Sequence, residues 1–286
     1  MTTAVGAGRA TLIRLRDRHS LPRPGRLVAA TVLALAAVAV IAPQLLAGSP
    51  ESIDPGIALQ SPNGTHLFGT DWLGRDEYAR VVYGARASLL VGVGSTLLAT
   101  VAGLLWGLGS ALGGPVADQI GMRLADVLLA FPTILMALLV VAVLGPGTGN
   151  VVLAITIALT PGFARLVRIR THEVRRLAYV RAALDLGIAP WRVTWRHIVP
   201  NVLLPLSVLV VINIGTAIII GSSLSFLGLG PDTAVPEWGT MLAQSRNYLS
   251  AAWTLALFPG LAITLTVMSI SVAGRALRER VDGVTQ

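Results

Sequence analysis

Residues 197–231 read HIVPNVLLPLSVLVVINIGTAIIIGSSLSFLGLGP, a run of 35 residues that contains no Asp, Glu, Lys or Arg. A helix that crosses the hydrocarbon core of a bilayer needs about 20 mostly apolar residues, so this run is long enough to span a membrane. The same charged residues are absent from 27–50, 87–117, 127–164 and 247–274. The pattern predicts an all-α protein that crosses a membrane several times.

The composition excludes several classes of protein. Of the 286 residues 54% are hydrophobic and 13% are charged, whereas a soluble domain carries about 25% charged residues. This composition argues against both a soluble enzyme and a disordered chain. All 22 basic residues are Arg, so the chain lacks the Lys of a phosphate-binding Walker A loop, and it has no Cys for disulfides or thiolate metal sites. With no HExxH motif and no pair of aspartates deep in a span, we expect neither a catalytic site nor a metal site.

The boundaries of the apolar runs predict six membrane spans. The 38-residue run 127–164 is interrupted by GPGTGN at 145–150, which cannot continue a helix and is typical of a tight turn. The run therefore supplies two spans. The predicted spans are 27–47, 88–112, 121–144, 150–170, 199–227 and 252–275. The first has an apolar core longer than the 7–15 residues of a signal peptide, so we expect it to be retained.

The arginines predict the orientation. Positively charged loops stay on the cytoplasmic side of a membrane. The segment 1–26 holds six arginines, the edge of the loop after the second span holds one, residues 165–196 hold eight, and the carboxyl end, made up of Arg275 and the segment 276–286, holds three. Together these are 18 of the 22 arginines. We therefore expect both termini in the cytoplasm. The segments 48–87 and 230–250 become extracytoplasmic loops, either docking surfaces for a soluble partner or simple caps on the bundle.

Polar and small residues within the spans have two possible roles. The GxxxG pair Gly103 and Gly107 allows helix backbones to approach closely, within the chain or against a second subunit. Hydroxyl and amide groups inside spans either line an aqueous pathway or form hydrogen bonds between helices. No span has an ionisable residue near its centre, which counts against a proton-coupled pump. The candidate pathway residues are Asn213, Thr216, Ser222 and Ser223.

The segment 171–198 between the fourth and fifth spans is the most informative stretch. Leu177, Val180 and Leu184 form one apolar helical stripe, and Gly187 is placed to end that helix. Pro190 fits the first turn of a second short helix, which carries Trp191 and Trp195 one turn apart. Two short amphipathic helices of this kind either lie among lipid headgroups or insert into a groove on a cytoplasmic protein. The physical pattern leaves these two alternatives open.

A resemblance to a known family favours the groove. Ala182, Ala183, Gly187 and Pro200 have the spacing of the EAA motif, the hallmark of permease subunits of binding-protein-dependent ABC importers. The first position, usually Glu, is Arg181 here, and the usual Ile and Leu positions are His197 and Val199. Further strings resemble the C-type permease of the dipeptide, oligopeptide and nickel branch. They are HLFGTDWLGRD (66–76), YGARASL (83–89), RHIVPN (196–201), LSFLGLG (224–230) and WGTML (238–242).

This resemblance implies a type I ABC importer permease in the bacterial cytoplasmic membrane, with a five-helix core over 88–275. It implies a heterodimer with a second permease, one or two ATPase subunits that bind ATP and Mg²⁺, and an extracytoplasmic substrate-binding protein. We expect no nucleic-acid partner. Peptides are the expected cargo, and nickel or another solute is the alternative. The rival class of protein is a channel or secondary transporter that does not use ATP. The residues implied to couple to the ATPase are Arg181, Ala182, Ala183, Asp185, Gly187, Trp191 and Pro200.

Overall fold

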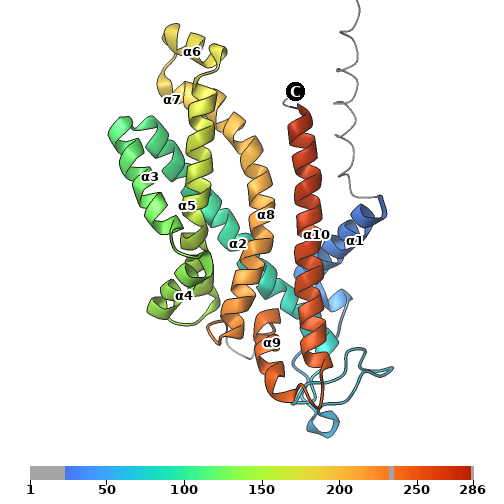
Figure 1. Ribbon diagram of the computed structural model, residues 1–286. Helices are drawn as coiled ribbons and strands as arrows, with labels where there is room; N and C mark the ends of the chain where they lie inside the picture. Colours follow the sequence, from blue (N-terminus) through green and yellow to red (C-terminus); the bar gives the residue numbers. More distant parts are fainter. Residues whose placement is uncertain (1–22, 232–234, 285–286) are drawn as a thin grey trace, which may run out of the picture.

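The apolar runs fold into helices (Figure 1). The computed structural model describes residues 23–231 and 235–284, and within these ranges the regular structure is helical apart from one isolated bridge between Thr70 and Asp76. Much of the predicted segment 1–26 lies outside the described residues. The longer helices are α1 (Arg23–Ile41), α2 (Glu77–Leu112), α3 (Pro115–Leu129), α4 (Thr133–Leu144), α5 (Thr148–Arg175), α8 (Val199–Phe226) and α10 (Thr254–Val284).

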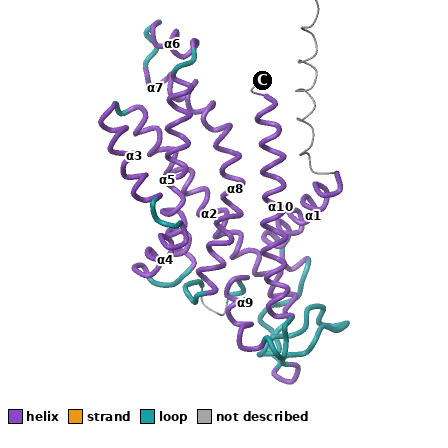
Figure 2. The backbone as a smooth tube through the Cα atoms, in the orientation of Figure 1, coloured by secondary structure: helices purple, strands orange, loops and turns teal. Residues whose placement is uncertain are grey.

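Short helices fill the connections, as the tube in Figure 2 shows. The single-turn helices η1 (Pro43–Leu45) and η2 (Pro55–Ile57) follow α1, and α9 (Trp238–Ser245) with η4 (Arg246–Tyr248) precedes α10. The connection after α5 holds α6 (Ala178–Asp185), α7 (Pro190–Val193) and the π-helical turn η3 (Thr194–Ile198).

The predicted span 121–144 is not one helix. Helices α3 and α4 meet at a bend of 90° between Leu129 and Thr133. Pro132 causes the break, because it lacks an N–H and disfavours a helical conformation at Phe131 before it. Within the described residues four helices are long and apolar enough to cross a membrane, or five if the bent pair is one span. The turn predicted at 145–150 is confirmed, because α4 ends at Leu144 and α5 begins at Thr148.

Several helices begin or end away from the predicted span boundaries; α10, for example, continues to Val284, past the predicted end at 275. Helix α1 stops at Ile41, short of the predicted end at 47, because Pro43 cannot continue it. Helix α2 begins at Glu77, ahead of the predicted span 88–112, because the side chain of Asp76 caps it by accepting a hydrogen bond from the N–H of Ala79. The end of the predicted loop 48–87 is therefore helical.

The GxxxG pair packs within the chain, where α2 makes its most extensive contact with α5. At Gly107 an added Cβ would lie 2.5 Å from the carbonyl oxygen of Ala164 and 2.7 Å from the Cβ of Val167. Gly103 faces Phe163 in the same way. These two glycines let the backbones of α2 and α5 touch, which is how helices associate in lipid.

The elements gather at two ends of the molecule (Figure 1). Helices α6 and α7 and the carboxyl end of α10 lie at one end, and α9 with the 42–76 connection lies at the other. The arginine-rich segments around 175–196 and 275–278 are therefore at the same end, as the charge pattern predicts. We call the two ends the α6–α7 tip and the 42–76 cap.

The glycine contact predicts a local stability effect. Gly107→Ala should lower the free energy of unfolding by about 1–3 kcal/mol, because the new methyl overpacks the α2–α5 contact. Gly109→Ala is the matched control, since no atom lies within 4 Å of its added Cβ. Denaturant titration of the purified protein in detergent measures both variants, and equal stability of the two would contradict the close contact.

Candidate functional site

The α6–α7 tip is shaped by a glycine in a left-handed conformation. Gly187 has φ +80°, a region that L-residues with a side chain rarely adopt. The N–H of Gly187 donates to the carbonyl of Leu184, and the N–H of Ile188 donates to the carbonyl of Ala183. This pair of bonds is a Schellman motif, which ends α6 and turns the chain. Gly187 is thus confirmed as the helix terminator.

Helix α7 is continuous with the membrane-spanning α8. Pro190 occupies its first turn, as predicted, and helical structure runs from Pro190 to Phe226 through the π-helical turn η3. The wider turn is closed by the N–H of Val199, which donates to the carbonyl of Thr194. Helices α7 and α8 therefore form one continuous helix, so a displacement of α7 must move the start of α8.

The inner side of the tip is anchored in the main hydrophobic core. Val180, Ala183, Val193 and Ile198 are buried in one cluster with residues of α5 and α8. Asn201 adds a polar tie, because its side-chain amide donates to the hydroxyl of Tyr179 at 3.1 Å and to the carbonyl of His197 at 2.7 Å. The tip is held firmly against the bundle from this side.

The outer side of the tip is apolar and basic. Leu186 is 81% exposed, and Trp191 and Trp195 are 62% and 61% exposed. The guanidinium of Arg192 lies 5.2 Å from the centre of the Trp191 ring. Exposed aromatic side chains beside arginines are typical of the centre of a protein interface. Other exposed residues of this surface are Arg181, Asp185, Ile188 and Arg196.

Most of the predicted coupling residues share this surface. Arg181, Ala182, Asp185, Gly187 and Trp191 are exposed at the tip, and Pro200 is exposed at the start of α8. Ala183 is the exception, because it is buried in the core and supports the tip from within. Their role in coupling stays a prediction.

The predicted pathway residues divide into two pairs. Asn213 and Thr216 donate hydrogen bonds to carbonyls one turn earlier on α8. Ser222 and Ser223 line a cavity of about 360 Å³ together with residues of α9 and α10. The hydroxyl of Ser222 is buried without a partner among the described residues, whereas Ser223 donates to the carbonyl of Ile219. Their role in a pathway also stays a prediction.

The predictions did not include a buried charge cluster in the 42–76 cap. Asp71 is fully buried and accepts hydrogen bonds from the Nε of Arg75 at 2.6 Å and from the backbone N–H of Leu73. The buried guanidinium of Arg80 lies 3.5 Å from the same carboxylate and 4.0 Å from that of Glu77. Two acidic and two arginine side chains thus lie together away from water. The sequence signal was present, since three of the four occur in or directly after the string HLFGTDWLGRD.

The cap is fastened to the helices by further contacts. Glu237 caps α9 by accepting hydrogen bonds from the N–H groups of Gly239 and Thr240, and it accepts a third from the hydroxyl of Ser88 on α2. The indole N–H of Trp238 donates to the carbonyl of Val81 at 2.8 Å. The predicted loop 230–250 is therefore largely an ordered element, with residues 232–234 outside the description.

Comparison with known proteins places the whole arrangement in a family. Residues 99–283 match the binding-protein-dependent transport system inner membrane component family. The chain belongs to this family. It is therefore a multi-pass component of a transport system in the bacterial inner membrane, and not a catalytic subunit.

Relatives of known name cover most of the chain. The dipeptide transport system permease protein DppC of Alkalihalophilus pseudofirmus is 42% identical over 86% of this chain and 81% of its own length. The glutathione transport system permease protein GsiD of Pectobacterium atrosepticum is 41% identical over 88% of this chain and 84% of its own length.

A solved structure shows the same fold. It is described as inward-facing conformations of the MetNI methionine ABC transporter, and one of its chains superposes with a TM-score of 0.58 at 18% identity. The match covers 70% of this chain and 95% of the other. At this level of identity the likeness establishes the fold alone.

The buried cluster predicts that Asp71 is needed for stability. Asp71→Asn should lower the free energy of unfolding by about 3–5 kcal/mol, because it leaves buried guanidinium groups without their counter-charge. Asp126→Asn is the matched control, since the Asp126–Arg165 pair is about half exposed and should contribute about 0–1 kcal/mol. Unfolding of the two variants in detergent is compared, and an equal loss in both would argue against the cluster.

Proposed function

We propose that this chain is one permease subunit of an ATP-driven peptide importer. It forms a heterodimer with a second permease, and ATPase subunits that bind ATP and Mg²⁺ lie beneath the pair. An extracytoplasmic binding protein delivers the cargo. The relatives that carry dipeptide or glutathione in their names support a peptide cargo. Nickel or another solute is the alternative cargo; the Nδ1 of His66 lies 3.1 Å from a carboxylate oxygen of Asp76, and this single pair does not make a metal site.

The observation that carries the proposal is the exposed apolar and basic surface of the α6–α7 tip. A groove on an ATPase would bury Leu186, Trp191 and Trp195, which are exposed in this chain. Because α7 is one continuous helix with α8, closure of the ATPases against the tip tilts a membrane-spanning helix. This chain supplies the helix that transmits the movement, formed by α7 and α8, and its ATPase partners supply the energy by binding ATP.

Six spans with both termini in the cytoplasm complete the proposal. Helix α1 and the bent pair α3–α4 count as spans in this topology, together with α2, α5, α8 and α10. The gathering of the α6–α7 tip and the carboxyl end of α10 at one end of the molecule supports it (Figure 1).

The tip predicts a coupling defect. Trp191→Ala in the assembled importer should reduce ATP-dependent uptake about tenfold or more, because an interface hot spot contributes roughly 2 kcal/mol or more. Trp253→Ala is the matched control, since Trp253 is 63% exposed but lies at the opposite end, next to α10. Uptake and ATPase activity are measured in proteoliposomes.

A second variant separates the shape of the tip from its side chains. Gly187→Val places a β-branched residue at φ +80° in open space, so its effect is backbone strain alone. It should leave the subunits assembled and weaken coupling. Normal uptake by both Trp191→Ala and Gly187→Val would overturn the proposed coupling through α7 and α8.

The proposed topology is tested with single cysteines, because the chain contains none. Ser61→Cys in the 42–76 cap should react with a membrane-impermeant maleimide in intact cells. Leu186→Cys at the tip should react only after the cells are opened. The reverse pattern would invert the orientation and contradict the proposal.

A further inference from the structure

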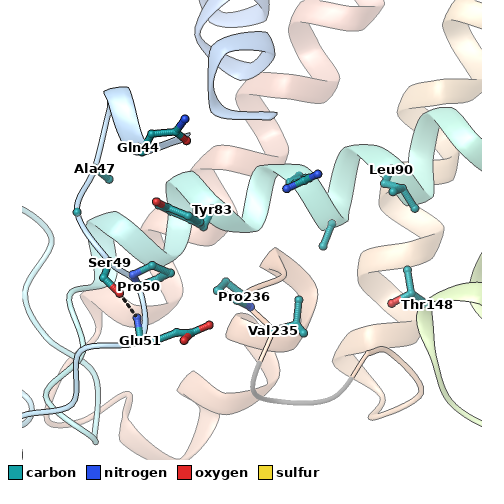
Figure 3. A pocket seen from close by; sticks show the side chains of 13 residues that line it. Gln44, Ala47, Ser49, Pro50, Glu51, Tyr83, Leu90, Thr148, Val235 and Pro236 are labelled. Atoms are coloured by element: carbon teal, nitrogen blue, oxygen red, sulfur yellow. Dashed lines mark hydrogen bonds between the residues drawn. The ribbon is translucent and has the colours of Figure 1, made fainter. Parts of the chain in front are cut away.

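A cavity with a mainly apolar lining and a few polar side chains lies beside α2 on the side of the 42–76 cap (Figure 3). Its volume is about 720 Å³. Gln44, Ser49 and Glu51 come from the connection after α1, and Tyr83 comes from α2. Arg86 of α2 also lines it. The cavity thus presents both a cation and an anion.

An apolar groove of about 500 Å³ runs between α1 and α2 and adjoins this cavity. Its walls are formed by aliphatic residues, with the side chain of Arg86 at one end. Arg86 and Leu90 line both the cavity and the groove. The cavity and the groove therefore form one continuous site, with charged side chains at one end and aliphatic side chains at the other. The remaining lining residues of the groove are Ala37, Val40, Ile41, Leu89, Val93 and Gly94.

The two charged groups of the cavity form no ion pair within the described part of the chain. Neither the guanidinium of Arg86 nor the carboxylate of Glu51 takes part in an ion pair with another described residue. The neighbouring cap behaves differently, because Asp71, Arg75 and Arg80 are close-paired there. Glu51 and Arg86 are both exposed, so both side chains can be reached by a ligand.

The surface of α2 beyond Arg86 has the polarity of a hydrocarbon chain. Leu90, Leu97, Val101 and Leu105 fall on one helical face and are each more than half exposed. At 1.5 Å per residue the stripe from Leu90 to Leu105 is about 22 Å long. One leaflet of the hydrocarbon core is roughly 15 Å thick, so an acyl chain lying along the stripe stays in contact with α2 throughout its length.

We propose that the cavity and the groove together bind one phospholipid with a zwitterionic amine headgroup, of the phosphatidylethanolamine type. Its phosphate pairs with Arg86 and its ammonium pairs with Glu51, while an acyl chain occupies the groove between α1 and α2. A peptide does not fit the apolar half of the site, which offers no polar partner for a backbone. A transmembrane helix in the groove would leave Arg86 without a counter-charge, and an anionic headgroup would leave Glu51 without one.

Native mass spectrometry of the delipidated full-length importer subunit, purified with its partner permease, tests the proposal by titration with phosphatidylethanolamine and phosphatidylglycerol. The wild type should bind phosphatidylethanolamine about fivefold more tightly. Arg86→Gln should weaken both lipids about tenfold, because both carry a phosphate. Glu51→Gln should weaken only phosphatidylethanolamine and so remove the preference.

The groove is tested with a pair of glycine variants on α2. Gly94 lines the groove and Gly109 does not, and an added Cβ meets no atom within 4 Å at either position. Gly94→Leu should fill the groove and reduce lipid occupancy about tenfold, whereas Gly109→Leu should bind lipid like the wild type.

Three results would overturn the proposal. The first is unchanged lipid binding in both Arg86→Gln and Gly94→Leu. The second is displacement of the bound lipid by a dipeptide, which would assign the cavity to the cargo. The third is loss of the partner permease in Gly94→Leu with lipid occupancy intact, which would assign the groove to the subunit interface. None of these outcomes depends on coupling to an ATPase.

Discussion

The close contact between α2 and α5 is the constraint on which the rest of the molecule depends. In lipid, helices gain nothing from burying apolar side chains away from water, so their association rests on packing and on polar contacts. Gly107 allows the backbone of α2 to touch Ala164 and Val167 of α5. Helix α2 carries the buried charges of the 42–76 cap at its start, and α5 leads into the α6–α7 tip at its end. This one contact therefore joins the two functional ends.

The helices could be predicted from the sequence because charged residues are confined to short segments. The turn at 145–150 and the helix terminator Gly187 were also predictable, since glycine and proline act through local backbone geometry. The start of α2 was not. Glu77 and Arg80 are buried in the cap cluster, but hydropathy treats charged residues as a sign of an exposed loop. Pairing of these charges depends on tertiary contacts that no pattern in α2 records.

Hydropathy also does not predict where a helix changes direction. The run 121–144 is apolar throughout most of its length, which predicts one span, yet α3 and α4 are bent by 90°. Pro132 marked the position of the break but not its angle. The angle is set where α3 and α4 pack against α5, and Arg168 of α5 holds the start of α3 through two hydrogen bonds to Asp118 at 2.7 and 2.6 Å.

The position of Arg181 also follows from the fold. The EAA motif usually has Glu at this site, and a reversal of charge in a buried ion pair would be costly. Arg181 is instead exposed on the outer side of α6, while Ala183 on the same helix faces the core. The fold of the tip is thus independent of the charge at Arg181, and under the proposed coupling role the reversal acts on the docked partner alone. An ATPase that fits this surface should present an acidic group, or no charge, opposite Arg181.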